Sequence, residues 1–594
     1  MITKNMESNW HPFLSRTLTF ITYEEIYGTS INIDEIIEQI KSLSIDYWIR
    51  IASMGRMILE HYESDLKYQG ILFKYLAPQR LKEIEIKYHD NKDRALFHRT
   101  QFLALLRLAL LYGEQIDQQE MDEEQIKEIT IRCLLGISSH IYETREEKPD
   151  FDTRYLENKL TFNVRKEIYD EERKFIMTIL QLYYNHLKEN MSSIVGRYKD
   201  MIFDIPKDDN FGPSGVERNL LEMVIKKELG LSEVEYSALT FGIVAKYISP
   251  EGIFKKGYHF PVDKEQHFIK TSINGKLVDR YFKTIAQSQS EYISEQIANG
   301  SYDGPITDFR SFMLRPLVYL DGSSKCFPAS LVYLQRLMES GLIWVAAGGE
   351  FRDDLRNYWG QVFEYYCQKI CRRIEENSIV KPKYFSELEY GSAGNRKKSC
   401  DAILVYGDKA IVMEFKIKSI RIKDTIINAD FNSLIEDINK AFIKSQDGDK
   451  AASQIDETIR SIRSGGLILP GINPHSIKTY YPVIVTLQTW PIGPFVYELI
   501  RREILRAGLL KQNHIAPVEI WSVEEFEYIE AILSSDSTNM AQLTNDKLIS
   551  KYSILPMATF LADKYSNNFP HNHYLAEKRE EMFEIVSNTL SLEK

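Results

Sequence analysis

The N-terminal third of the chain carries apolar side chains at spacings of three and four residues, which is the pattern of amphipathic helices. The clearest such segments are 31–62, 99–112, 124–141 and 171–198. A loop-like passage at 206–216, with two prolines and two glycines, follows them. We therefore predict a mainly helical domain over 1–205 and a mixed, mostly helical region over 206–350.

From about residue 350 onward, the pattern changes to strands that alternate with helices. Apolar runs of strand length lie at 384–389, 399–406, 409–417, 481–487 and 518–522, and helical patterns lie at 353–374, 431–463, 495–510 and 523–533. Such alternation predicts an α/β domain whose mixed sheet is covered by helices on both faces. We place this domain at 351–535 and a helical tail at 536–594, so the predicted fold class is multidomain α/β.

Composition narrows the class of protein further. The 594 residues are 44% hydrophobic and 27% charged, which excludes a disordered or fibrous chain. Lys and Arg number 74 against 85 Asp and Glu, so the net charge is −11 and a nucleic-acid partner would need a local positive region. The five cysteines cannot all pair, which favours a reducing cytoplasm. No signal-like or membrane-length apolar run is found, so we expect no membrane association.

Ionisable residues interrupt one apolar hairpin in the C-terminal domain. Gly407-Asp408 separates two apolar runs, and glycine in the first position favours a two-residue type II′ turn. With that turn, the numbers of paired residues add up to 815, so Asp401 lies opposite Glu414. Strand alternation places Lys416 on the same face, because it is two residues beyond Glu414.

This placement of charge needs a physical explanation. Like charges directly opposite each other destabilise a sheet, and a buried carboxylate costs several kcal/mol unless it is paired or binds a cation. The single lysine offsets only part of that free energy. A divalent cation between the two carboxylates offsets more, and hard oxygen ligands favour Mg²⁺ or Mn²⁺.

The sequence Cys400-Asp401 … Glu414-Phe415-Lys416 resembles the motif of the PD-(D/E)XK nuclease superfamily. That family's core is a helix, a three-strand meander, a helix and a further strand, so the resemblance implies a restriction-endonuclease-like domain. It implies that Asp401 and Glu414 hold the metal, together with the backbone carbonyl of Phe415. Lys416 would position or activate the attacking water. The family's usual proline before the aspartate is Cys400 here.

Two more positions follow from the same resemblance. Many of these nucleases have a glutamate on the first core helix that reaches toward the metal, and Glu364 occupies that place in the predicted helix 353–374. The alternative is a partly solvated residue at the edge of the helix. Gln454 is similar to the glutamine of a subgroup in which a tyrosine follows four residues later, but Thr458 stands there, so Gln454 could equally be a solvated helix position.

The segment around the hairpin is locally basic. Between residues 396 and 423 there are eight basic and three acidic residues, so the local net charge is 8 − 3 = +5. Basic residues beside such a site would hold a phosphate backbone without reading its sequence. The residues we expect to bind nucleic acid are Arg396, Lys397, Lys398, Lys418, Arg421 and Lys423. An ordinary solvated charged rim is the alternative.

The sequence therefore predicts a metal-dependent DNA endonuclease, with RNA left open as a substrate. By analogy with related nucleases that carry large front ends, we expect a bacterial restriction or anti-phage defence effector whose N-terminal half recognises a protein partner or the substrate. Double-strand cleavage with one site per chain would suggest a homo-oligomer such as a dimer. The alternative is a catalytically inactive nuclease-fold subunit that binds nucleic acid or assembles with a partner.

Overall fold

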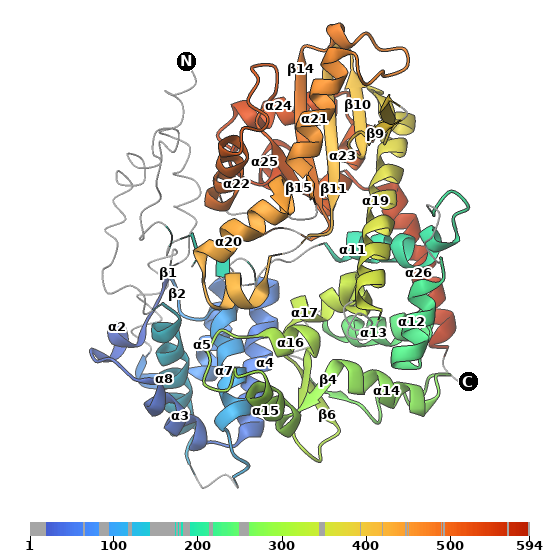
Figure 1. Cartoon of the computed structure of the whole chain (residues 1–594). Coiled ribbons are helices and arrows are strands. Elements are labelled where there is room, and N and C mark those ends of the chain that lie inside the picture. Colours follow the sequence, from blue (N-terminus) through green and yellow to red (C-terminus); the bar gives the residue numbers. More distant parts are fainter. Residues whose placement is uncertain are drawn as a thin grey trace. The chain divides into compact units, whose positions relative to one another are not determined.

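The computed structural model of the chain is shown in Figure 1. It describes residues 19–591 except for 63–65, 82–93, 117–120, 143–172, 174–175, 178–179, 182–183, 185–189, 213–217, 249–259, 344–350, 393, 419, 446–447, 450, 489, 491–493 and 567–569. The chain folds into two compact units, each built from segments that are distant in the sequence. The first comprises Met1–Arg165, Ile225–Val345 and Ile585–Lys594, and the second comprises Lys166–Val224 and Ala346–Glu584. The predicted boundaries divide the sequence linearly, whereas these units do not.

The first unit is mainly helical. Its elements are β1 (Thr19–Phe20), α2 (Tyr23–Tyr27), α3 (Ile33–Lys41), α4 (Ile45–Tyr62), α5 (Leu66–Leu76), η1 (Gln79–Leu81), β2 (Arg94–Ala95), α7 (Arg99–Tyr112), α8 (Glu123–Tyr142), α13 (Glu233–Ile248), β3 (Val262–Asp263), α14 (Gly275–Ile285), β4 (Ala286–Ser288), α15 (Gln289–Ala298), α16 (Arg310–Leu314), β5 (Leu317–Tyr319), β6 (Lys325–Pro328), α17 (Leu331–Arg336) and η5 (Leu337–Gly341). Helix α12 (Leu220–Leu229) crosses the division between the units at residue 224.

Helix α7 lies at the centre of the first unit and is buried along almost its whole length. Its one interior charge, Arg107, is satisfied by hydrogen bonds to the Tyr292 hydroxyl, the Gln296 side chain and the Ser301 carbonyl. Within the described residues, no helix of the chain is both long and apolar enough to cross a membrane.

The second unit is built around a five-stranded sheet. Its strands are β7 (Lys383–Ser386), β10 (Ala402–Tyr406), β11 (Lys409–Lys416), β14 (Thr479–Thr486) and β15 (Glu519–Ser522), in the spatial order β15-β14-β11-β10-β7. The first three along the chain form an antiparallel meander, and β11, β14 and β15 run parallel to one another. The mixed sheet predicted for the C-terminal half is thus confirmed.

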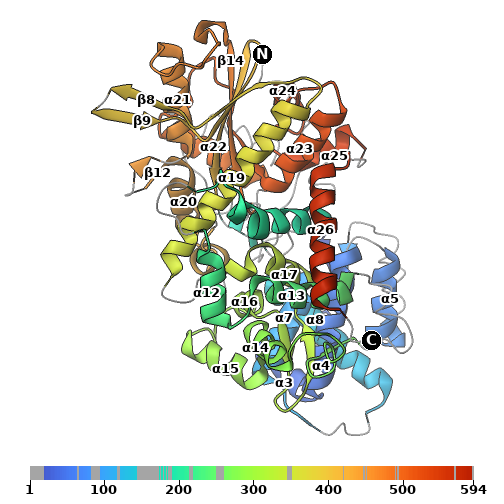
Figure 2. The same cartoon turned by 90° about the vertical axis from the view of Figure 1, so that its right-hand side faces the viewer.

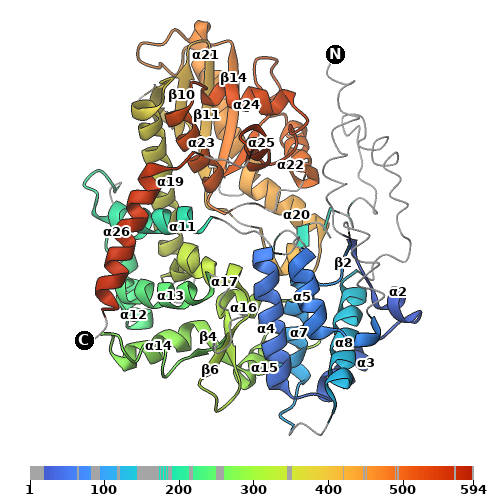
Figure 3. The same cartoon turned by 180° about the vertical axis from the view of Figure 1, so that it is seen from behind.

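Helices cover both faces of this sheet. Helix α21 (Ala451–Ser464) lies on one face, and α23 (Val523–Ser535) and α24 (Met540–Ile549) lie on the other (Figures 1 and 3). The remaining elements of the unit are α11 (Met191–Tyr198), η2 (Lys199–Asp204), η3 (Ile205–Lys207), α19 (Arg352–Asn377), β8 (Glu389–Ser392), β9 (Asn395–Lys398), η6 (Ile422–Ile427), α20 (Phe431–Ile438), η7 (Asn439–Ile443), β12 (Lys444–Ser445), β13 (Gly448–Asp449), η8 (Pro474–Ser476), α22 (Pro494–Arg506), α25 (Met557–Lys564) and α26 (His573–Thr589), the last of which crosses into the first unit.

Two predicted elements are wrong in detail. The helical pattern over 431–463 is interrupted by η7 and the short hairpin β12–β13, because Gly448 between two aspartates is a poor helix former. The strand expected over 384–389 ends at Ser386, and residues 389–392 pair instead with 395–398 in a separate hairpin.

Candidate active site

The hairpin β10–β11 has the register predicted from its turn. Gly407 has a φ of 60°, as the first position of a type II′ turn requires, and Ala402 pairs with Met413. Continuing this register by one residue places Asp401 opposite Glu414. The Phe415 amide donates a 2.7 Å hydrogen bond to Asp401 Oδ2, which fixes the aspartate beside β11.

Both carboxylates are buried on one face of the sheet. Asp401 is 6% exposed and Glu414 is 1% exposed. The Phe415 ring lies 6.4 Å from the ring of Phe526 on α23, so alternation turns Glu414 toward the opposite face, which α21 covers. Lys416 shares that face, and its Nζ lies 2.5 Å from Glu414 Oε1. The structure thus brings three of the predicted residues together.

The second oxygen of Glu414 lacks a partner. Glu414 Oε2 is buried and accepts no hydrogen bond from the described residues. A buried carboxylate oxygen without a donor costs free energy that a cation would recover. This oxygen and the neighbouring Asp401 carboxylate are the hard ligands that Mg²⁺ or Mn²⁺ prefers, so the donor set fits a divalent cation.

Burial and mutual repulsion shift the titration of these groups. Burial, and then the negative charge of Asp401, raises the pKa of Glu414 to about 8. Burial also raises the pKa of Asp401, although Lys416 and the Phe415 amide oppose that effect. Burial alone would lower the pKa of Lys416, but the charges of Glu414 and Asp401 outweigh it and raise the pKa. Lys416 is therefore a protonated hydrogen-bond donor in this arrangement.

Glu364 on α19 belongs to the same electrostatic cluster. Burial, and then the charges of Asp401 and Glu387, raises its pKa to about 8. Its carboxylate accepts a 3.3 Å hydrogen bond from Gln368 on the next turn of the helix. In the described part of the chain, no three histidine, cysteine, aspartate or glutamate side chains are close enough to hold a metal ion. Glu364 therefore influences the two buried carboxylates electrostatically, at more than ligand distance.

Gln454 lies on α21, the helix that packs over β11. Among the described residues, no hydrogen bond joins its side chain to Asp401, Glu414 or Lys416. Thr458, one turn later, accepts a 2.9 Å hydrogen bond from the Cys400 amide. The helix thus holds the residue before Asp401 through its threonine.

Sequence reasoning missed one carboxylate, Glu387. Strand β7 pairs with β10 so that Ser386 lies opposite Ala402, and one further step places Glu387 opposite Asp401. Glu387 pairs with Lys398 at 2.7 Å and raises the pKa of Asp401, after the larger effect of burial. The pairing register of β7 with β10 would have revealed Glu387. That register cannot be derived from the sequence, because the β8–β9 hairpin lies between the two strands.

The predicted nucleic-acid-binding residues fall in two places. Arg396, Lys397 and Lys398 are exposed on β9, and Lys418, Arg421 and Lys423 follow β11. The β9 residues pair with Glu389, Glu457 and Glu387 respectively. Arg421 binds Asp437 at 2.6 Å and Glu436 at 3.0 Å, which ties η6 to α20, whereas Lys423 is exposed. The local excess of positive charge is thus partly balanced by acids from elsewhere in the chain.

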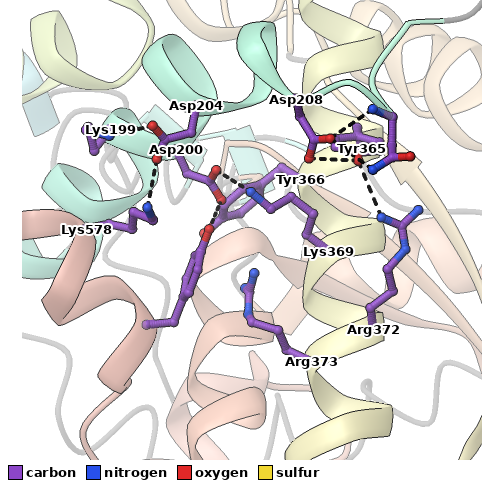
Figure 4. Close-up of polar contacts among 12 residues, drawn as sticks. Lys199, Asp200, Asp204, Asp208, Tyr365, Tyr366, Lys369, Arg372, Arg373 and Lys578 are labelled. Carbon is purple, nitrogen blue, oxygen red and sulfur yellow. Dashed lines mark hydrogen bonds and ion pairs between the residues drawn. The ribbon is translucent and has the colours of Figure 1, made fainter.

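Helix α19, which carries Glu364, is anchored by polar contacts on another side (Figure 4). Lys369 donates a 2.5 Å hydrogen bond to Asp200, which also accepts one of 2.7 Å from the Tyr574 hydroxyl. Tyr366 donates a 2.6 Å hydrogen bond to Glu527. Segments from residues 200, 527 and 574 therefore fix the position of this helix.

Comparison of the chain with protein-family models, curated proteins and solved structures found no match.

We expect Mg²⁺ to raise the melting temperature of the protein more at about pH 9 than at about pH 6. The pKa values of Glu364 and Glu414 are about 8 in the folded protein, above their ordinary value of 4.5. Between these values the folded state binds more protons than the unfolded state, so the stability of the metal-free protein falls as the pH rises. A cation must displace these protons at the lower pH but not at the higher one.

Thermal melts in EDTA and in Mg²⁺ at both pH values measure this difference. Glu414→Gln is the control, because it removes one titrating carboxylate and should flatten the dependence on pH. An equal Mg²⁺ shift at both pH values would contradict the expectation.

Proposed function

We propose that the second unit hydrolyses phosphodiester bonds of DNA in a Mg²⁺-dependent reaction. The observation that carries this proposal is the pair of buried, adjacent carboxylates Asp401 and Glu414 with Lys416 beside them, one carboxylate oxygen being unpartnered. Structural ion pairs seldom leave a buried charge half satisfied, because each missing partner destabilises the fold. In a cation-binding site, by contrast, the bound cation offsets that destabilisation.

Each residue has a role that follows from its position. Asp401 and Glu414, with the carbonyl of Phe415, would hold the cation, which when bound neutralises phosphate charge and lowers the pKa of a coordinated water. Lys416 Nζ is held by Glu414 and donates hydrogen bonds, so it orients the attacking water or a phosphate oxygen. Glu364 would favour cation binding in its ionised form, which its pKa of about 8 makes more abundant as the pH rises.

The order of elements also supports the proposal. Helix α19, the meander β7–β10–β11, helix α21 and strand β14 follow one another in the order that the PD-(D/E)XK resemblance implies. By analogy with nucleases that carry large front ends, we further propose that the protein is a cytoplasmic restriction or anti-phage defence effector whose N-terminal half recognises a partner.

A cleavage assay tests the proposal. Purified protein is incubated with plasmid and with single-stranded DNA and RNA, in Mg²⁺, Mn²⁺ or EDTA. We expect cleavage of DNA in either metal and none in EDTA. Lys416→Ala should reduce the rate about 10²-fold or more, because it removes the hydrogen-bond donor of the site.

Lys409→Ala is the matched control, since it removes the same charge from the other end of β11. Binding without cleavage in every metal would contradict the proposal and favour a catalytically inactive nuclease-fold subunit.

A further inference from the structure

The hairpin β8–β9 stands apart from the five-stranded sheet. Among the described strands, β8 and β9 form a sheet of their own, and each contributes four residues to the pairing. At about 3.3 Å per residue, the ribbon is about 13 Å long. Figure 2 shows it projecting from the side of the second unit. Its second strand ends at Lys398, three residues before Asp401, so the hairpin leads directly into the candidate site.

The outer part of the hairpin carries basic side chains and has small residues at its tip. Residues 390–397 include two basic and no acidic side chains. The described residues at its tip include Gly391, Ser392 and Gly394, and an added side chain at Gly394 would meet nothing within 4 Å. Small residues let the backbone approach a ligand closely.

The register assigns the basic residues to faces. Gly391 pairs with Arg396 and Glu389 with Lys398, so Arg396 and Lys398 share one face of the ribbon. Lys397 is on the other face and pairs with Glu457 of α21. Lys398 pairs with Glu387, the residue next to Asp401 in register, so the face with Arg396 and Lys398 is the one toward the carboxylates.

The ion pairs on this face are exposed and exchangeable. The side chains of Arg396 and Glu389 are 70% and 59% exposed, whereas Lys398 is 63% exposed and its partner Glu387 is 30% exposed. Exposed pairs of this kind contribute only about 0–1 kcal/mol. A polyanion can therefore replace the glutamates as the partner of both bases.

The shape of the ribbon discriminates between nucleic acids. The major groove of B-form DNA is about 12 Å wide and admits a two-stranded β-ribbon. The major groove of an A-form RNA duplex is deep and narrow, so it does not admit one. A single strand has no groove to receive the ribbon.

We propose that the β8–β9 hairpin is a DNA-binding arm that enters the major groove of a B-form duplex, with Arg396 and Lys398 on phosphates next to the bond to be cleaved. This inference rests on the proposed hydrolysis and narrows its substrate to double-stranded DNA. The second strand of the arm is continuous with the segment that contains Asp401. DNA bound by the arm would therefore have its sugar–phosphate backbone next to the carboxylates.

Binding measured in EDTA tests the arm separately from cleavage. The full-length protein is titrated with a duplex DNA of about 30 bp, with the RNA duplex of the same sequence and with the single DNA strand, at several salt concentrations. The double variant Arg396→Gln/Lys398→Gln is compared with Lys409→Gln/Lys478→Gln. The control removes two positive charges from the other end of β11 and β14.

The wild type should bind the DNA duplex about tenfold or more tightly than the RNA duplex or the single strand. The arm variant should lose about tenfold in affinity for duplex DNA, and its salt dependence should fall by about two in log–log slope, because two phosphate contacts are lost. The control should stay within about twofold of the wild type.

Equal binding of RNA and DNA duplexes, or unchanged binding by the arm variant, would overturn the inference. Arm-dependent binding of duplex DNA without any Mg²⁺-dependent cleavage would instead overturn the proposed hydrolysis and leave the arm in place.

Discussion

Asp401→Asn is expected to abolish cleavage and to stabilise the metal-free protein. Asparagine keeps an oxygen that can accept the hydrogen bond from the Phe415 amide, but it removes the negative charge that holds a cation. We expect cleavage to fall by at least about 10³-fold, as for the loss of a group that stabilises transition-state charge.

The gain in stability has a separate physical reason. Asp401 is buried beside Glu414, and its charge contributes to raising the pKa of Glu414 to about 8. At about pH 9, above the pKa of Glu414, removing one of two repelling buried charges should increase the free energy of unfolding by about 1 kcal/mol in EDTA. Denaturant titration measures this change.

Asp408→Asn is the matched control, because Asp408 lies in the turn of the same hairpin and its side chain is 49% exposed. It should leave cleavage unchanged and alter stability by less than about 0.5 kcal/mol. If Asp401→Asn destabilised the metal-free protein, the aspartate would be a structural residue and the candidate site would be wrong. If Asp401→Asn stabilised the metal-free protein but the wild type cleaved no DNA, the pair of carboxylates would belong to an inactive domain.

Glu527→Ala is expected to destabilise the second unit strongly. Glu527 lies on α23 with its side chain 1% exposed, and it binds the 2%-exposed Arg197 of α11 at 2.7 Å. It also accepts the hydrogen bond from Tyr366 on α19. Removing the carboxylate takes a buried, hydrogen-bonded partner from both the Arg197 guanidinium and the Tyr366 hydroxyl, which costs about 3–5 kcal/mol.

Urea unfolding measures the effect, with Glu580→Ala as the control. Glu580 pairs with Arg579 at 2.7 Å but is 65% exposed, so its removal should change stability by less than about 0.5 kcal/mol. The double variant Arg197→Met/Glu527→Leu should recover most of the loss, because it removes both charges. Equal effects of Glu527→Ala and Glu580→Ala would show that the buried Glu527 carboxylate does not stabilise the second unit.

The sequence predicted those features of the site that depend on residues close together in the chain. Gly407-Asp408 sets a two-residue turn, and such a turn fixes the register of the strands on either side. The opposition of Asp401 and Glu414, and the face that Lys416 shares with them, follow from that turn alone. The helices and strands of the C-terminal half could be predicted because the spacing of their apolar residues matches the periods of helix and strand.

Where strands are joined by longer connections, the sequence did not reveal the pairing. Glu387 lies opposite Asp401, but thirteen residues that include a separate hairpin intervene, so no turn defines that register. The partners of the basic residues show the same limit: Lys397 meets Glu457 and Arg421 meets Asp437 only after α20 and α21 have packed in place.

By itself, the sequence determined the class of fold, the hairpin and the three residues Asp401, Glu414 and Lys416 on one face. The tertiary structure decided how deeply these groups are buried, which oxygen lacks a partner and what holds α19. It also decided that two units are each assembled from distant segments. The physical reason is that backbone turns and side-chain periodicity act over a few residues, whereas burial and charge pairing depend on chain segments that meet only when the protein folds.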